Sequence, residues 1–333
     1  MLYTDLFQNL DNSESVKGAL FYIGDIIGNT NIILCYNFKT KKIYSSADEW
    51  LHLINIYYKT IPNHPYYTHL VNTYNHRMKV ITTDYRYSKE EVISLITSFS
   101  RGTVHGYAGF FFIINHIIEN KSIYNKYKII VSENSSIGIL QIIKYLKRKK
   151  VLTNNIIVLS THIRYKFKSI KFIKNKWHIF PKNLDLNLIK QYLISDNIIC
   201  PKNRICILKN SKSDNKTRSG IVNINVVHKF CFKNKLLLVE PTETDEITMI
   251  NFLHTCSFLV VSWGTAFFKN YIYLSEKCAY IIVLVIGNDF INQYNQFKEN
   301  KNLITKFKKS KIIYYVTDTE LSIDLSKYMK KFL

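Results

Sequence analysis

The pattern of residues 236–288 constrains the fold more than any other part of this chain. Within it, the run Cys256–Val261 predicts a buried strand, because short apolar runs rich in β-branched residues suit the interior of a parallel sheet. Gly264, one of only ten glycines among 333 residues, follows this run and predicts a tight turn. A helical stretch over 266–276 and an apolar strand over 279–286 complete a strand–turn–helix–strand unit. In such a unit the turn lies outside the carboxyl end of the first strand, where free backbone N–H groups favour an anion such as a phosphate.

The same alternation extends along most of the chain. Strands are predicted at 20–27, 32–36, 128–131, 156–159, 168–173, 204–208, 224–229, 236–239, 257–261, 279–286 and 312–316. Helices are predicted at 50–61, 90–99, 107–119, 137–147, 184–195, 243–254, 266–275, 289–298 and 321–333. The segment 197–203 contains Pro201 and interrupts the pattern. It therefore predicts a boundary between two α/β domains, residues 1–198 and 199–318, with an amphipathic helix over 319–333.

The net charge of +22 and the pI of 9.5 are properties that nucleic-acid-binding proteins share. Here Lys is abundant together with Asn, Ile and Tyr, whereas Gly numbers 10 and Pro only 5. This joint bias is typical of an AT-rich genome, such as that of a protist or a large DNA virus. We therefore expect most of the charge to be compositional and do not expect a nucleic-acid partner.

Cysteine spacing and hydropathy give expectations about metal sites and compartment. The six cysteines form no Cys-x-x-Cys pair, and those beside apolar runs are expected to be buried free thiols. The N-terminal residues show no signal-peptide pattern, and no charge-free apolar run reaches about 18 residues. The sequence therefore predicts no membrane span and a cytoplasmic location, in the host cell if the protein is viral.

A family resemblance lies in the same C-terminal region. Glu246, the run Cys256–Val261, the tetrapeptide Ser262-Trp263-Gly264-Thr265 and then Asn270 resemble the signature region of glycosyltransferase family 61. Upstream, the strand Ile205–Leu208 with the loop residue Arg218, and the segment Gly106–Phe110, follow the order of that family. The resemblance covers roughly residues 100–290. Trp263 stands where the family usually has histidine.

The resemblance implies transfer of a sugar from a nucleotide-sugar donor to a hydroxyl group of a glycan or protein acceptor. It implies the α/β architecture called GT-B, with two Rossmann-like domains facing a cleft and a C-terminal helix returning to the first domain. Residues 1–198 would bind the acceptor and residues 199–318 the donor. The donor-binding candidates are Arg218, Glu243, Glu246, Ser262, Trp263, Gly264, Thr265 and Lys269.

Transfer also requires a base that removes the proton of the acceptor hydroxyl. His105, just before the predicted helix 107–119, and Asp25, beside Gly24, are the catalytic candidates. The chain contains no Asp-x-Asp motif, so no metal or other cofactor is expected. Helix N-termini and basic side chains would then stabilise the leaving diphosphate.

Each candidate also has a purely structural interpretation. Gly264 can serve only the turn, Trp263 can pack in the core, and Arg218 can be a surface side chain. Acidic residues such as Glu243 and Glu246 stabilise a helix start, and Lys269 suits a solvated helix face.

Two other functions therefore stay open. One is a polyanion-binding protein that uses the basic segments 144–150 and 164–176. The other is a degenerate transferase homologue that binds glycan without turnover because Trp263 replaces the histidine of the family.

Overall fold

The chain forms two compact units, Met1–Asp185 and Leu186–Leu333. The computed structural model describes residues 7–8, 15–17, 19–27, 30–37, 42–45, 86–96, 103–160, 163, 165–171, 173, 189–207, 224–241, 243–264, 267, 269–270, 273–274, 278–286, 291 and 311–317. Among these residues, no helix is long and apolar enough to cross a membrane. The predicted helices over 50–61 and 321–333 lie outside the described residues.

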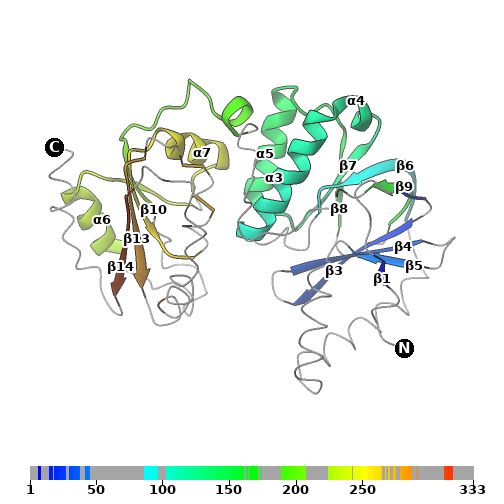
Figure 1. The fold of residues 1–333 in the computed structure, drawn as a ribbon, viewed down its shortest axis with the longest axis horizontal. Helices are drawn as coiled ribbons and strands as arrows, with labels where there is room; N and C mark the ends of the chain where they lie inside the picture. Colours follow the sequence, from blue (N-terminus) through cyan, green and yellow to red (C-terminus); the bar gives the residue numbers. More distant parts are fainter. Residues whose placement is uncertain are drawn as a thin grey trace, which may run out of the picture. The chain divides into compact units, whose positions relative to one another are not determined.

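The first unit is built on a nine-stranded mixed sheet (Figure 1). Its strands are β1 Phe7–Gln8, β2 Ser15–Lys17, β3 Ala19–Ile27, β4 Thr30–Asn37, β5 Lys42–Ser45, β6 Arg86–Ser94, β7 Lys128–Ser132, β8 Ile156–Leu159 and β9 Tyr165–Lys171. They follow the order β1-β5-β4-β3-β9-β6-β7-β8, and β2 pairs with β9. The strands β9, β6, β7 and β8 are mutually parallel, whereas β3 joins β9 antiparallel.

Helices connect the parallel strands of this sheet. They are α3 Thr103–Glu119, α4 Lys121–Tyr124 and α5 Ile137–Arg148, and α3 and α5 lie side by side in Figure 1. Since β9 lies on the other side of β6 from β7 and β8, the strand order reverses between β6 and β9, as in a Rossmann half.

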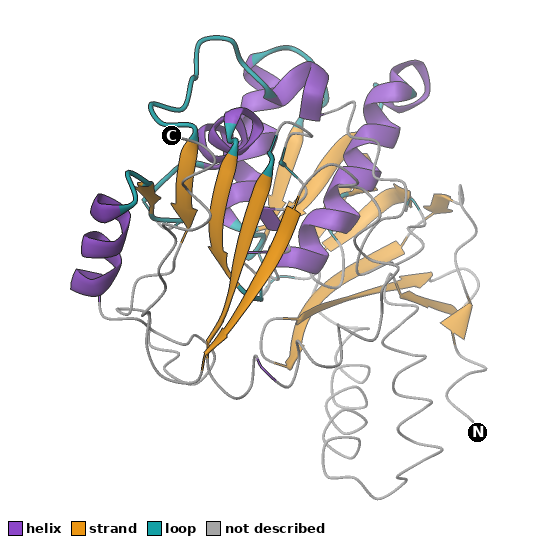
Figure 2. Ribbon diagram, turned by 60° about the vertical axis from the view of Figure 1, so that its left-hand side comes forward, coloured by secondary structure: helices purple, strands orange, loops and turns teal. Residues whose placement is uncertain are grey.

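The second unit is a five-stranded sheet in which every pairing is parallel. Its elements are β10 Arg204–Ile207, α6 Ile224–Lys233, β11 Leu237–Val239, α7 Glu246–Thr255, β12 Phe258–Ser262, β13 Tyr280–Ile286 and β14 Lys311–Thr317. The order β11-β10-β12-β13-β14 is the 2-1-3-4-5 order of flavodoxin-like sheets, and Figure 2 shows these strands side by side. Parallel α/β sheets in both units are consistent with two Rossmann-like domains.

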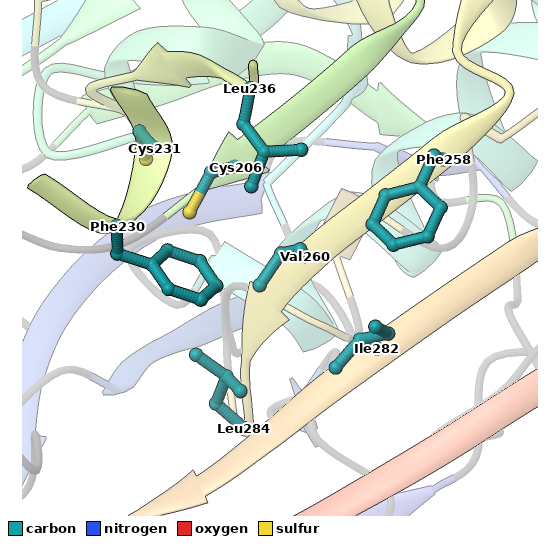
Figure 3. Close-up of a cluster of buried hydrophobic side chains, with 8 residues drawn as sticks. All are labelled: Cys206, Phe230, Cys231, Leu236, Phe258, Val260, Ile282 and Leu284. Carbon is teal, nitrogen blue, oxygen red and sulfur yellow. The ribbon is translucent and has the colours of Figure 1, made fainter. Parts of the chain in front are cut away.

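Helices cover both faces of the second sheet, with α6 and α7 on opposite sides in Figure 1. Figure 3 shows Phe230 and Cys231 of α6 next to Cys206 of β10 and Val260 of β12. Phe258, Leu259, Val260 and Val261 are each 0% exposed, so β12 is buried on both faces. A strand buried on both faces needs a continuous apolar run, which explains why the sequence predicted it well.

Most predicted elements are confirmed, but two predicted types are wrong. The segment 90–99 was expected to be helical, yet Glu90 to Ser94 belong to strand β6. Val92 and Ile93 are 0% exposed between β9 and β7, so burial on both faces overrides the helical preference of the two glutamates. The segment 224–229 was expected to be a strand because it is rich in Ile and Val, but it begins helix α6.

The spacing of buried residues explains why α6 is a helix. Phe230, Cys231 and Asn234 are buried, while residues 228, 229, 232 and 233 are exposed. This spacing follows one helix face, which packs on the sheet.

The segment 184–195 was predicted to be helical, and its described part contains only a π-helical turn over Ile189–Leu193. The backbone N–H of Ser195 donates to Oδ1 of Asn251 at 2.7 Å, and Nδ2 of Asn251 donates to the Leu193 carbonyl at 3.1 Å. Asn251 lies on α7, so this segment is bonded to the second unit. The units therefore divide between Asp185 and Leu186, earlier in the chain than the predicted boundary between residues 198 and 199.

Candidate functional site

The carboxyl ends of β10 and β12 lie next to each other in the second unit. Ile207, the last residue of β10, pairs with Val261 of β12. The chain leaving β10 proceeds to β11 on one side, and the chain leaving β12 proceeds to β13 on the other side. The two connections therefore diverge above this point of the sheet. In open α/β sheets such a switch point is where ligands bind.

Several predicted candidates belong to these connections or border them. Arg218 lies in the segment 208–223 that follows β10, which is outside the described residues, as is Thr265. Gly264 lies in the turn after β12, and Ser262 ends that strand half-buried. The segment that contains Arg218 and the turn that contains Gly264 thus begin at neighbouring strand ends.

The turn after β12 has a backbone conformation that requires glycine. Gly264 has φ 92° and is buried. A side chain with a Cβ is disfavoured at positive φ, by roughly 1–2 kcal/mol in the left-handed region. The N–H of Trp263 donates to the Leu284 carbonyl of β13 at 2.8 Å, which fixes the turn to the neighbouring strand. Phe267, Lys269 and Asn270 are helical, so a helical segment follows the turn as predicted.

Trp263 packs in the protein interior, which was one of the two interpretations of this residue. Its side chain is 3% exposed and stacks on Phe267 with ring centroids 5.8 Å apart and an interplanar angle of 16°. The ring of Tyr314 on β14 meets it edge-on at 6.0 Å. The indole ring is therefore enclosed by protein and does not present a face for a nucleotide base or a sugar.

Glu246 and Lys269, two predicted donor residues, form an ion pair. Nζ of Lys269 lies 2.7 Å from Oε2 of Glu246, and their side chains are 16% and 6% exposed. Glu246 is in the first turn of α7, which begins after the carboxyl end of β11, and Lys269 follows the glycine turn after β12. Both residues therefore belong to the carboxyl edge of the sheet, where the pair places an ammonium group close to the switch point.

The helix start itself is capped by another residue. Oδ1 of Asp245 accepts hydrogen bonds from the backbone N–H groups of Ile247 and Thr248, both at 3.1 Å. Glu246 is thus not the capping side chain, although its charge suits the N-terminus of α7. Glu243 lies just before the helix and is exposed.

The described cysteines of the second unit are free and buried, as expected. Hydrogen bonding to Cys231 and burial raise the pKa of Cys206 well above its usual value. Hydrogen bonding to Cys278 and burial do the same to the pKa of Cys256. Cys256 and Cys278 immediately precede the amino ends of β12 and β13, opposite the glycine turn. In the described part of the chain, no group of three His, Cys, Asp or Glu residues is arranged to hold a metal ion.

The two catalytic candidates lie on different elements of the first unit. His105 is in the first turn of α3, which begins beyond the carboxyl end of β6. Asp25 pairs with Asn31 near the end of β3, and β3 runs antiparallel to β9 through the pair Phe21 and Tyr165. Asp25 therefore lies beyond the amino end of β9.

A carboxylate that the sequence analysis missed lies at the same edge as the start of α3. Glu133 follows β7, and its Oε1 accepts a hydrogen bond of 3.0 Å from Oγ of Ser160, which follows β8. At the same edge, Oγ of Ser136 lies 3.4 Å from the hydroxyl of Tyr107 on α3. The signal in the sequence was the position of Glu133, two residues after the end of the predicted strand 128–131.

Comparisons of the sequence with models of known protein families and with curated proteins find no match.

Proposed function

We propose that this protein is a glycosyltransferase that uses a nucleotide-sugar donor. The observation that carries the proposal is the glycine turn after β12. It lies at the switch point of a parallel sheet, has φ 92° at Gly264, and is followed by Lys269 in its ion pair with Glu246. The resemblance of the sequence to glycosyltransferase family 61 supports the choice of this class among nucleotide-binding proteins.

The donor diphosphate would bind at this turn for physical reasons. Without a side chain at Gly264, phosphate oxygens can approach the backbone closely, and the start of a helical segment after the turn would supply N–H donors. Lys269 adds a positive charge on the same segment, and Glu246 orients it through a bond of 2.7 Å. Arg218, in the loop that leaves β10, would supply paired N–H donors to the phosphates.

In the transfer step, the acceptor oxygen forms a bond to the anomeric carbon as the bond from that carbon to the diphosphate oxygen breaks. The acceptor proton passes to a base, and the leaving diphosphate takes the electron pair of the broken bond. We assign the donor to the second unit and the acceptor to the first, as in GT-B enzymes. His105 is the base candidate from the sequence, and Glu133 is the carboxylate at the same edge of the first sheet.

A second candidate function is donor or glycan binding without turnover. The observation that favours it is the packing of Trp263, which fills the place of the family's histidine with a ring that is 3% exposed. If that histidine supplies the chemistry in the family, this turn lacks it.

A transfer assay separates the two functions. The full chain is incubated with uridine- and guanosine-diphosphate sugars, and both donor binding and release of the nucleoside diphosphate are measured. The proposal predicts binding with release, whereas the second candidate predicts binding alone. Absence of binding to every donor would contradict both.

The same assay tests Arg218. We expect Arg218→Ala to weaken donor binding by about 1.5–3 kcal/mol, the value of a hydrogen bond to a charged group. Its melting temperature should match that of the parent protein, because the sequence around the residue is polar and Arg218 is not expected to contribute to a core. A variant that binds and turns over donor like the parent would remove Arg218 from the site and leave the Gly264 turn alone.

A further inference from the structure

The first unit carries a concentration of positive charge that the proposed transferase site does not use. From residue 134 to residue 184 the sequence contains no Asp or Glu, although the chain as a whole has 24. Further lysines precede this segment on α4 and in the turn that follows it. We define the basic edge as Lys121, Lys126, Arg148, Lys149, Lys150 and Lys171.

The structure brings the two halves of this basic edge together. Nδ2 of Asn154 donates to the carbonyl oxygens of Tyr124 and Tyr127, both at 2.8 Å. Oγ1 of Thr153 donates to Oδ1 of Asn125 at 3.2 Å. These bonds join the turn after α5 to the turn between α4 and β7. The cations of residues 121–126 and 148–150 therefore belong to neighbouring turns at the amino ends of β7 and β8.

Aromatic rings position several of these cations. Nζ of Lys171 lies 5.0 Å from the ring centroid of Tyr124 and 5.8 Å from that of Tyr127, and Nζ of Lys126 lies 5.2 Å from the latter. The rings themselves are enclosed, since Tyr124 is 4% and Tyr127 8% exposed. Rings that are buried cannot stack on the bases of a single-stranded nucleic acid.

Two carboxylates near the basic edge have partners of their own. Glu90 pairs with Lys128 at 2.6 Å, and Glu119 accepts a hydrogen bond of 2.9 Å from Asn115. The edge also carries an exposed apolar side chain: Ile123 of α4 is 52% exposed. An exposed isoleucine among lysines combines an apolar contact with positive charge.

We infer that the basic edge binds an anionic lipid surface. Lysines held near a membrane are attracted by its negative surface potential, and an apolar side chain among them enters the boundary between headgroups and acyl chains. Lysines predominate over arginine on this edge, and they provide point charges rather than the paired donors that read phosphates specifically. The buried tyrosines argue against a single-stranded nucleic acid as the partner.

Vesicle sedimentation with the full chain tests this inference. Vesicles of phosphatidylcholine with phosphatidylserine are compared with vesicles of phosphatidylcholine alone at physiological salt. The charge-reversed variant carries Lys126→Glu, Lys149→Glu and Lys150→Glu. Its matched control carries Lys229→Glu, Lys233→Glu and Lys235→Glu on and after α6 of the second unit. Each set changes three exposed lysines, and each includes a lysine with positive φ, Lys150 at 57° or Lys235 at 53°.

The expected results are as follows for variants that melt like the parent. The parent binds only the anionic vesicles, the basic-edge variant binds them on the order of a hundredfold more weakly, and the control changes little. Ile123→Ser weakens binding about fivefold, whereas Phe232→Ser, at another exposed apolar residue, does not. Equal losses in both charge variants would show that net charge alone drives binding and would overturn the inference. So would tight binding of duplex RNA or DNA at the same salt together with no binding to vesicles.

Discussion

At the residue scale, Gly264 is the position where sequence, backbone and proposed chemistry coincide. Its φ of 92° is accessible to glycine and unfavourable for β-branched residues. We expect Gly264→Ala to lower the free energy of unfolding by about 1–2 kcal/mol, and Gly264→Val by more. Urea unfolding measures both. Unchanged stability in the two variants would show that the turn does not need this conformation.

The Glu246–Lys269 pair gives a second prediction at this scale. Both side chains are largely buried, so removing one charge leaves the other in a poorly solvated position. Glu246→Gln and Lys269→Met should each destabilise the protein by about 3–5 kcal/mol. The double variant should recover much of that loss and should still bind donor poorly, because Lys269 is gone. Single-variant losses that simply add in the double variant would mean that the two side chains do not interact.

At the scale of elements, the thiols before β12 and β13 make stability depend on pH. Hydrogen bonding to Cys278 and burial raise the pKa of Cys256 in the folded protein, while an unfolded thiol titrates near about 8.5. A raised folded pKa contributes stability below the unfolded pKa, and this contribution is lost as the pH rises above it. Stability should therefore fall above about pH 8.5, and Cys256→Ala should make that fall shallower.

Urea midpoints measured across this pH range compare the Cys256→Ala variant with the parent. An equal slope in Cys256→Ala and the parent would contradict the assignment.

Elements of the second sheet were predictable where local pattern and tertiary environment agree. β12 is an apolar run that is buried on both faces of the sheet and is followed by a glycine turn. All three features favour a strand at this position. The helix α6 was missed because Ile and Val at 224–227 favour a strand locally, while its buried face is set by contacts with Cys206 and Val260. No property of residues 224–229 alone reveals those contacts.

The residues of the candidate site were also predictable only in part. Gly264 was predictable because a tight turn with positive φ needs glycine. The pairing of Glu246 with Lys269 depends on how β11 and β12 flank β10, so the sequence suggested both residues without suggesting their contact. The edge that Asp25 occupies depends on the antiparallel pairing of β3 with β9, which no local pattern indicates.

At the scale of the whole molecule, each of the two α/β units contains a set of parallel strands, and we propose that the second unit binds the donor. Among the parallel strands of each sheet the order reverses at one point, between β6 and β9 in the first unit and between β10 and β12 in the second. The donor is assigned to the second of these points, where the Gly264 turn and the Glu246–Lys269 pair lie. The basic edge of the first unit is not part of this donor site, so lipid binding and donor binding can be tested independently.

The most direct measurement is calorimetric titration of the full chain with uridine and guanosine diphosphates in the presence of a chelator. The account predicts that at least one nucleoside diphosphate binds without added metal, and that Gly264→Val abolishes this binding while the protein remains folded. Binding that is absent in chelator and restored by a divalent cation would contradict the metal-free site. Binding that survives in a folded Gly264→Val variant would contradict the location of the diphosphate at this turn.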